Sequence, residues 1–338
     1  MSDGLWRFRR RDVLVPQLSG PRGSRSPQNR WLPTGNGRRP SRRFDRARSR
    51  QVAINTQTGA PWGIARISYR PKPTSVTFER YVYDERAGEG VDIYVLDTGV
   101  HTAHLGFGGR ARQGVNVTGG GNDDTVGHGT HLAGTAAGSK YGVAKNASVI
   151  AVKVTDNMLA NPGNIAEGLA WTTEQAQSSG RPSIALIGSC QSRNLALDEQ
   201  VNDAARQGLF VVVPAGDDNK DALNYSPSGA SGAFTVGASN IRDERAFWSN
   251  HGPGIDVFAP GFNIPSAFIG GPNTANIMSG TAQAAAHIAG LAAYLLSTTD
   301  GLTTTTVRDA ITQLATRDLL TAVPTPTSNL LAFNNATP

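Results

Sequence analysis

Residues 91–99 read Val-Asp-Ile-Tyr-Val-Leu-Asp-Thr-Gly, and this stretch decides the fold class of the 338-residue chain. Its first six residues are mostly apolar and β-branched, which is typical of a short buried strand. Asp97 follows directly and is therefore expected at the carboxyl end of that strand. Because an aspartate in this position often only closes a turn, Asp97 alone is a weak indication of chemistry.

The same kind of apolar run recurs at 149–154, 183–187, 209–213, 234–236 and 255–258. Apolar residues have helical spacing at 165–177, 197–206, 281–296 and 307–316. Strands that alternate with helices predict a parallel sheet with helices on both faces. The functional groups of such sheets gather at the carboxyl ends of the strands, where Asp97 and Asp217 are both expected.

Charge is distributed unevenly along the chain, whose formal net charge is +6. Residues 1–50 contain 14 Arg and 3 Asp, a net charge of +11, so the rest of the chain is net negative, at −5. We expect residues 1–52 to form an Arg-rich disordered arm and 53–338 a single domain. The arm is either a tether for nucleic acid or an anionic surface, or a solvated tail, and its composition favours the tail.

Several classes of protein are excluded by composition. No run of about 18 apolar residues occurs, so we expect no membrane contact. The single cysteine, Cys190, excludes an intrachain disulfide and any metal site built from several thiolates. No apolar signal segment follows Met1, and together with the lack of disulfides this favours an intracellular protein over a secreted one. We expect a monomer that requires no cofactor.

Two further segments carry the chemistry. Residues 127–131 read Gly-His-Gly-Thr-His, and the glycines that flank His128 let the backbone pack closely while the imidazole stays accessible. A lone histidine in a Gly-rich turn is more often structural, but Asp97 can orient His128 as a base. The other segment, 277–290, begins Ile-Met-Ser-Gly-Thr-Ala and continues as a small-residue helix.

In this order, these segments resemble the subtilisin-like serine peptidases, and in particular the proteinase K branch. The likeness covers nearly all of residues 53–338. It implies a subtilisin-like three-layer α/β/α sandwich with a seven-stranded parallel sheet, recognition of an extended peptide, and an Asp/His/Ser triad. The motifs that carry it are Ala60–Ile67, Asp97–Gly99, Gly127–His131, Tyr141–Ala144, Asn224–Pro227, Phe258–Gly261, Ser279–Thr281 and Asn329–Asn334.

The chain departs from the family pattern at the nucleophile. The resemblance assigns Asp97 and His128 to the triad, but Ala282 stands where the serine is expected. A methyl group cannot attack a carbonyl, because acyl transfer needs an oxygen or sulfur nucleophile beside the base. In subtilisin itself, loss of this serine lowers kcat by about 10⁶-fold.

A second departure concerns the oxyanion. The family places an asparagine, whose amide donates to the developing negative charge, at the position of Asp217. An ionised carboxylate repels that charge, although a protonated one can still donate, and some relatives use aspartate there. The turn after the nucleophile position also differs and reads Gln-Ala-Ala-Ala at 283–286.

The resemblance also implies binding residues around the cleft. The expected substrate-binding residues are Met158, Leu159, Ala160, Gly188, Ser189, Cys190, Ala215 and Gly216. We expect the Cys190 thiol to be a small buried hydrophobic group rather than a substitute nucleophile.

One calcium site carries over from the resemblance. It combines the Asp256 carboxylate with backbone carbonyls near Ser231 and Ala233, and a simple turn cap explains Asp256 equally well. By contrast, we expect Asp123, Asp124 and Asp156 to lie in solvated loops rather than to bind calcium.

Three functions are compatible with this sequence. The first is a serine protease homologue that is inactive by the serine route and binds an extended peptide in its cleft by strand addition. The second is a recruited enzyme in which Asp97, His128 and Asp217 act as acid and base on a small molecule, driving cyclisation, isomerisation or dehydration. The third is an engineered or natural Ser-to-Ala form of an active protease.

Overall fold

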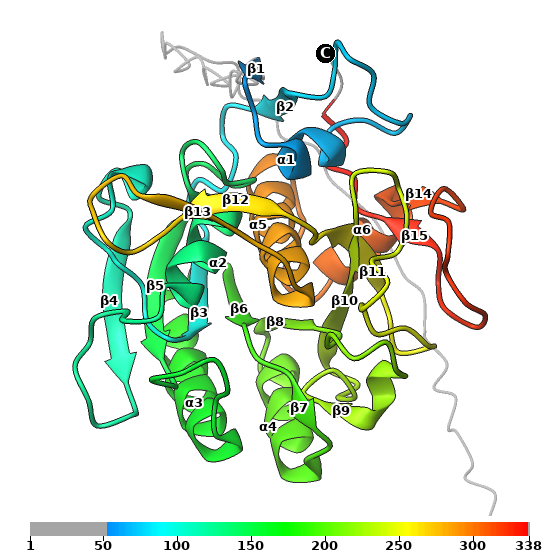
Figure 1. Cartoon of the computed structure of the whole chain (residues 1–338). Helices are drawn as coiled ribbons and strands as arrows, with labels where there is room; N and C mark the ends of the chain where they lie inside the picture. The colour runs from blue at the N-terminus through cyan, green and yellow to red at the C-terminus, as the bar shows by residue number, and fades with distance from the viewer. Residues whose placement is uncertain (1–52, 337–338) are drawn as a thin grey trace, which may run out of the picture. The chain divides into compact units, whose positions relative to one another are not determined.

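The computed structural model describes residues 53–336, and these form a large sheet covered by helices on both faces (Figure 1). The predicted arm at 1–52 lies outside the described residues. The main sheet has the strand order β14-β15-β11-β10-β8-β6-β3-β5-β4. Its strands are β3 Asp92–Asp97, β4 Ala111–Asn116, β5 Ser148–Lys153, β6 Ser183–Ile187, β8 Phe210–Pro214, β10 Ala233–Ser239, β11 Val257–Pro260, β14 Thr316–Arg317 and β15 Leu330–Leu331.

The three-layer α/β/α sandwich predicted from the sequence is confirmed, with more strands than expected. Seven strands, from β4 across to β11, pair in parallel. The C-terminal segment adds two strands of two residues at the edge, β15 parallel to β11 and β14 antiparallel to β15. The resemblance implied the seven parallel strands. The residue pattern did not indicate β4, whose residues are largely exposed, nor the two edge strands, which are too short to show a period.

Helices cover the two faces in separate groups. Helices α2 His128–Ala137 and α5 Thr281–Thr298 pack together on one face, and α3 Pro162–Ser179 and α4 Leu195–Arg206 pack on the other. Strand β3 serves both layers, because Ile93 and Val95 join the core under α2 and α5 while Tyr94 and Leu96 join the core under α3 and α4. This period of two is what a strand buried on both faces requires.

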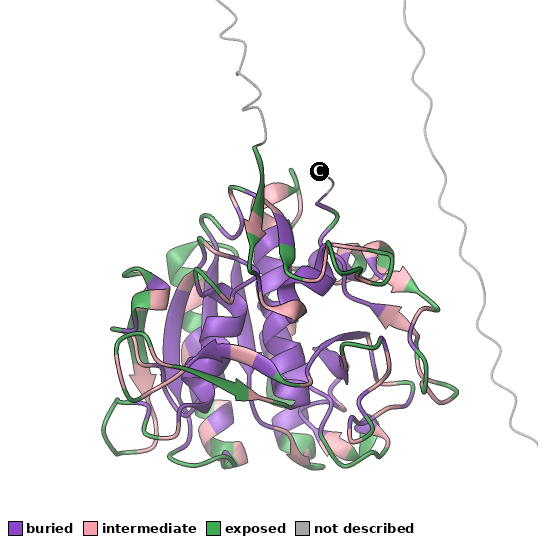
Figure 2. Cartoon of the chain, turned by 45° about the horizontal axis from the view of Figure 1, so that its top comes forward, coloured by how far each residue is buried: buried purple, intermediate pink, exposed green. Residues whose placement is uncertain are grey.

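Helix α5 runs through the interior of the molecule and is buried from Thr281 to Leu295 (Figure 2). Small residues allow this burial, because they let neighbouring backbones approach closely. A Cβ on Gly290 would lie 2.5 Å from the Ala136 carbonyl oxygen of α2, so any larger residue would force the two helices apart. The start of α5 is therefore held rigidly, and Ala282 lies in its first turn.

The remaining elements are short or peripheral. Antiparallel pairs form between β1 Ile54–Thr58 and β2 Arg80–Asp84, between β12 Ile264–Ala267 and β13 Ala275–Met278, and between β7 Gln191–Ser192 and β9 Tyr225–Ser226. The other helices are α1 Trp62–Ile67, α6 Val307–Leu314 and two 3₁₀ turns at Leu105–Phe107 and Ala222–Asn224. Among residues 53–336, no helix combines the length and the apolar character needed to cross a membrane.

Candidate active site

Asp97 and His128 meet at the carboxyl end of β3. The Nδ1–H of His128 donates to the Asp97 carboxylate, with both oxygens 2.9 Å away. The backbone N–H of Thr98 also donates to Asp97, at 2.8 Å, and fixes the carboxylate further. Gly188 lies so close to this carboxylate that a Cβ there would collide with it. The sequence placed His128 in a Gly-rich turn, whereas it is the first residue of α2.

The electrostatics of His128 follow from this geometry. Burial by itself lowers the pKa of the imidazole, because a charged ring loses its hydration. The charge and the hydrogen bond of Asp97, with smaller contributions from Asp124 and Asp217, outweigh burial and raise the pKa of His128 above its ordinary value. The pair therefore has the arrangement of an oriented base, with Nδ1 held and Nε2 left for chemistry.

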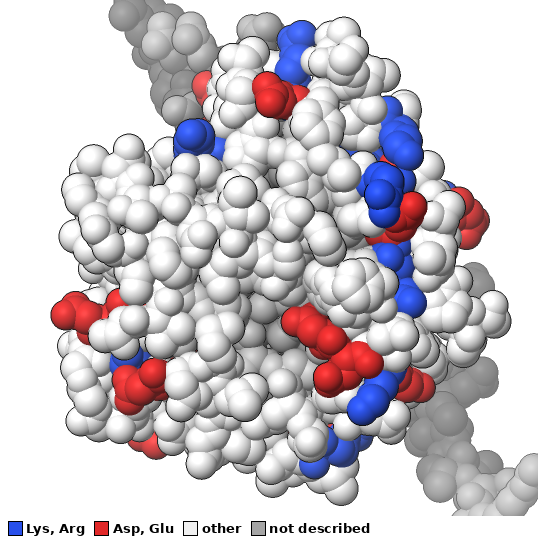
Figure 3. Space-filling view, viewed as in Figure 1, with Lys and Arg blue, Asp and Glu red and all other residues white. Residues whose placement is uncertain are grey.

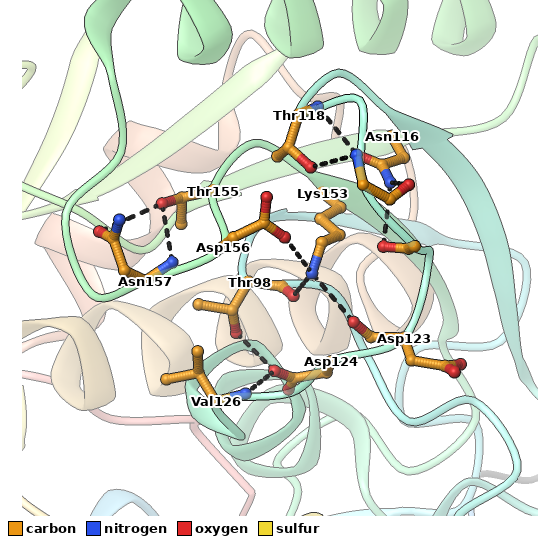
Figure 4. Close-up of polar contacts among 12 residues, drawn as sticks. Thr98, Asn116, Thr118, Asp123, Asp124, Val126, Lys153, Thr155, Asp156 and Asn157 are labelled. Carbon is orange, nitrogen blue, oxygen red and sulfur yellow. Dashed lines mark hydrogen bonds and ion pairs between the residues drawn. The ribbon is translucent and has the colours of Figure 1, made fainter.

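Asp124 corrects one of the loop predictions. The sequence suggested a solvated loop, but Asp124 is buried and accepts hydrogen bonds from the Thr98 hydroxyl and from the backbone N–H groups of Val126 and Gly127 (Figure 4). It also accepts from the backbone and hydroxyl of Thr130 in the first turn of α2. Asp124 thus ties the loop to the amino end of the helix that carries His128, where a carboxylate is favourable.

Lys153 contacts the other two loop aspartates, Asp123 through its backbone carbonyl and Asp156 through its carboxylate. Its ammonium group, which is almost fully buried, donates to the carbonyl oxygens of Thr98 and Asp123 at 3.0 and 2.9 Å (Figure 4). It also pairs with Asp156 at 3.0 Å, and this contact lowers the pKa of that exposed carboxyl. A cation of the chain itself therefore joins the loops beside β3 and β5.

Ala282, which the resemblance places at the nucleophile position, lines the same cleft as His128. The hydroxyls nearby are engaged elsewhere. Ser279 Oγ accepts the backbone N–H of Asn263 at 2.8 Å, and Thr281 Oγ1 accepts the backbone N–H of Gly216 at 3.0 Å. Both hydroxyls therefore bond the backbone of neighbouring segments.

Asp217 follows β8 and faces the same cleft. Its Oδ1 accepts the backbone N–H of Thr281 at 2.9 Å, so the carboxylate caps the amino end of α5. Although the residue is exposed at the cleft, the surrounding protein displaces water from its carboxyl, and this raises the pKa of Asp217 against the opposing effect of Thr281. Gly216 can place Asp217 there because its φ of +101° is a conformation that favours glycine.

Cys190 lines the cleft, but its thiol is not a reactive nucleophile. Its Sγ lies 3.3 Å from the Ser228 hydroxyl. Burial raises the pKa of the thiol to about 12, so the reactive thiolate is scarce at neutral pH. This agrees with the prediction of a small hydrophobic group.

Most of the predicted binding residues meet at this cleft, which has a volume of about 280 Å³. Two predicted residues do not line it: Ala160 packs in the core under α3, and Ala215 packs beneath the cleft floor with its carbonyl accepting from Asn250. Both are small enough to be fully covered by their neighbours. The lining residues are His128, Met158, Leu159, Gly188, Ser189, Cys190, Pro214, Gly216, Asp217, Asp218, Tyr225, Met278, Ser279, Gly280, Thr281, Ala282 and Gln283.

Sequence reasoning missed three of these features. Asp218 places a second carboxylate beside Asp217, and the Asp-Asp pair after Gly216 was the available signal. The Ser189 hydroxyl and the Gln283 amide nitrogen are buried without a hydrogen-bond partner among the described residues. Nothing in a sequence reports an unpartnered atom, because pairing depends on the whole neighbourhood.

The predicted calcium ligands lie together at the edge of β10. Arg308 of α6 contacts them: its Nη1 donates to Asp256 Oδ1 at 2.5 Å and its Nη2 donates to the Ala233 carbonyl. Ser231 instead bonds Asn202 through its hydroxyl at 3.2 Å. A guanidinium therefore lies where the sequence predicts a cation, and calcium binding at Asp256 stays a prediction that would require Arg308 to move.

A parallel sheet flanked by helices, with an Asp–His pair at the end of a central strand and the amino end of a buried helix across the cleft, defines the subtilisin-like class of fold and site. The chain belongs to the Subtilase family, Peptidase_S8, which it matches over residues 88–332.

Named relatives support this assignment. The chain is 42% identical over 301 residues to Subtilisin-like protease 8 of Arthroderma benhamiae, covering 82% of this chain and 61% of the relative. It is 43% identical over 302 residues to Subtilisin-like serine protease Pen c 2 of Penicillium citrinum, covering 83% and 66%. The chain thus spans about two thirds or less of the length of these relatives.

Solved structures agree with the fold. A cold-adapted subtilisin-like serine proteinase superimposes with a TM-score of 0.76 and 34% identity, covering 83% of this chain and all of the other. Sphericase gives a TM-score of 0.70 with 27% identity, covering 82% of this chain and 98% of the other. The large parallel sheet and its helices are therefore those of subtilisin-like proteinases.

Proposed function

We propose that this chain is a subtilase homologue that binds an extended peptide in its cleft and does not hydrolyse it by a serine nucleophile. The observation that carries the proposal is Ala282, which occupies the nucleophile position in a cleft where the Asp97–His128 pair is intact. The base is in place, and the atom that it would activate is missing. The relatives are named as proteases, so the proposal distinguishes this chain from them.

The neighbouring groups offer no substitute nucleophile. The hydroxyls of Ser279 and Thr281 accept backbone hydrogen bonds, and the raised pKa of Cys190 keeps its thiol protonated. An ionised Asp217 would also repel the negative charge of a tetrahedral intermediate. Loss of the nucleophile and replacement of the oxyanion donor act in the same direction.

Binding of an extended peptide is supported by the rim of the cleft. Met158 and Leu159 line the cleft and leave 51% and 69% of their surfaces exposed, so they offer apolar surface to a bound chain. Such a rim suits alternating side chains of a peptide that adds along the groove.

The recruited-enzyme hypothesis remains the second candidate. Its supporting observation is that His128 and Asp217, both with raised pKa values, face one cleft and provide an acid and a base. The exposed apolar rim counts against it, because small-molecule sites are usually enclosed. Loss of a measured conversion in His128→Ala would favour this candidate.

The test combines a fluorophosphonate probe with an unfolded protein substrate. We expect neither labelling nor cleavage by the native chain or by Asp217→Asn, because both lack the nucleophile. The double variant Ala282→Ser/Asp217→Asn should gain labelling, since it restores the oxygen and the amide donor together. Labelling or turnover by the native chain would overturn the proposal.

The single variant Ala282→Ser tests the third hypothesis, that the chain is a Ser-to-Ala form of an active protease. Full proteolysis by this variant would identify the chain as a Ser-to-Ala form of an otherwise competent protease. We expect it to remain much weaker than the double variant, because Asp217 still opposes the oxyanion; a single missing oxyanion-hole donor costs about 10²–10³ in kcat.

A further inference from the structure

Acidic side chains outnumber basic ones in the lining of the cleft. Among the residues that line it, the charged or titratable side chains at neutral pH are Asp217, Asp218 and His128, and the Nδ1 of His128 is already held by Asp97. Neither a lysine nor an arginine belongs to the lining. Acidic side chains lie beside the hollow at the end of β8 in Figure 3.

The Asp217 carboxylate and the backbone of Asp218 are held in place by hydrogen bonds. Asp217 is held by the Thr281 N–H through one oxygen. The backbone N–H of Asp218 donates to Asn250 Oδ1 at 3.1 Å, and the same oxygen accepts the N–H of Lys220 at 2.8 Å. The loop after β8 therefore has a fixed backbone, and both of its aspartates line the cleft.

Two of the residues that line the cleft carry buried polar atoms without partners. Ser189 is 9% exposed and Gln283 is 1% exposed, and both line the cleft. The Ser189 Oγ and the Gln283 Nε2 have no hydrogen-bond partner within residues 53–336. A buried polar group that stays unpaired is unfavourable, so a ligand that reaches these atoms and supplies an acceptor and a donor gains binding free energy.

Other carboxylates of the domain form ion pairs with lysine or arginine side chains of the same domain. Asp156 pairs with Lys153 and Asp256 pairs with Arg308. For Asp217 and Asp218 no ion pair with a lysine or arginine is found in the part of the chain that the structure describes. Within residues 53–336, His128 is therefore the basic side chain that shares the cleft with these carboxylates, and neither carboxylate has a lysine or arginine partner.

We infer that the cleft recognises the arginine or lysine side chain of an extended peptide. The inference rests on the proposed peptide binding and names its ligand class. A guanidinium can reach the free carboxylate oxygens of Asp217 and Asp218 through charge-assisted hydrogen bonds and donate to Ser189 Oγ. A peptide carbonyl can accept from Gln283 Nε2. Such a ligand satisfies both unpartnered groups and both negative charges at once.

Two sources supply this chemistry. One is the chain itself, whose residues 1–50 contain 14 Arg. The other is a separate basic peptide or protein. The recognising groups are the same in both cases, so the experiment has to tell the two sources apart.

The experiment measures binding of fluorescent hexapeptides Gly-Ala-Ala-X-Ala-Gly to the full-length protein, with X as arginine, citrulline, norleucine or glutamate. Citrulline matches the shape of arginine without its charge. We expect arginine to bind about 10-fold more tightly than citrulline and glutamate to bind least, since charged hydrogen bonds are worth about 1.5–3 kcal/mol. Asp218→Asn should lower the arginine-to-citrulline ratio to about 3-fold. The exposed Glu167→Gln on α3 is the matched control and should leave it unchanged.

The outcomes separate this inference from the proposed function. Equal binding of arginine and citrulline peptides would overturn the basic ligand and leave peptide binding intact. The source of the basic side chain is tested with a second full-length variant. In this variant the 14 arginines of 1–50 are changed to serine. Tighter arginine-peptide binding by this variant supports the chain's own segment as the ligand, and unchanged binding supports a separate peptide. Binding of no peptide by either protein would overturn the inference together with peptide binding.

Discussion

The loops around Lys153 and the cleft around Asp217 differ in how their aspartates are paired. At the first, a buried ammonium group joins two backbone carbonyls and the Asp156 carboxylate, and the loops are completed by the chain's own atoms. At the second, two adjacent carboxylates and two unpartnered polar groups remain without a cation within the described residues. The difference teaches that the same residue type, aspartate, is paired with a lysine in one region and has no lysine or arginine partner among the described residues in the other.

The largest effect is expected at Lys153. Lys153→Met removes the ammonium and leaves the buried carbonyl of Thr98 without its donor, at a cost of about 2 kcal/mol in the free energy of unfolding. Urea denaturation measures it. Lys140→Met, at an exposed lysine, should change the value by less than about 0.5 kcal/mol. Equal effects of the two variants would show that Lys153 is not a structural cation.

A pH-dependent effect of intermediate size is expected at His128. Its folded-state pKa is raised, so the protonated form is favoured in the folded protein. This contribution is complete below the unfolded-state pKa of about 6.5 and is lost as the pH rises through the folded-state value. The unfolding free energies of the native chain and His128→Gln, measured across this window, should converge at high pH. A difference that grew with pH would mean that the pKa is lowered.

The smallest effect on the free energy of unfolding is expected when an unpaired and a paired aspartate are each changed to asparagine. Asp218→Asn removes one of two adjacent like charges that have no cation, and it should raise the free energy of unfolding by about 0.5 kcal/mol. Asp256→Asn removes a carboxylate paired with Arg308 and should lower the same quantity by about 1 kcal/mol. Thermal denaturation of both variants gives the two signs. Destabilisation by Asp218→Asn would place that residue with the structural carboxylates.

The sequence predicted the elements that have a strong period. The strand at 183–187 matches β6 residue for residue, and the helix at 307–316 ends two residues later than α6. Helix α2 was missed, because its Gly- and Thr-rich start hides helical spacing and its stability comes from packing against α5 and from Asp124. Local pattern carries little information about such tertiary support.

The candidate site was predictable in part for the same reason. Asp97 and His128 lie in motifs, and the structure brings them together as the motifs imply. Arg308 stands 52 residues from Asp256, so no local pattern indicated that a guanidinium would reach that carboxylate. Ala160 and Ala215 were assigned by motif position, whereas burial depends on the neighbours that cover them.

The guanidinium of Arg308 has one more consequence. A metal ion at Asp256 would be in exchange with the medium, and its occupancy would follow the ion's concentration. A side chain of the same polypeptide is present at a fixed ratio of one to one and cannot be removed by chelators or dialysis. With Arg308 in this position, the anchoring of α6 beside β10 and β11 does not depend on a bound metal ion.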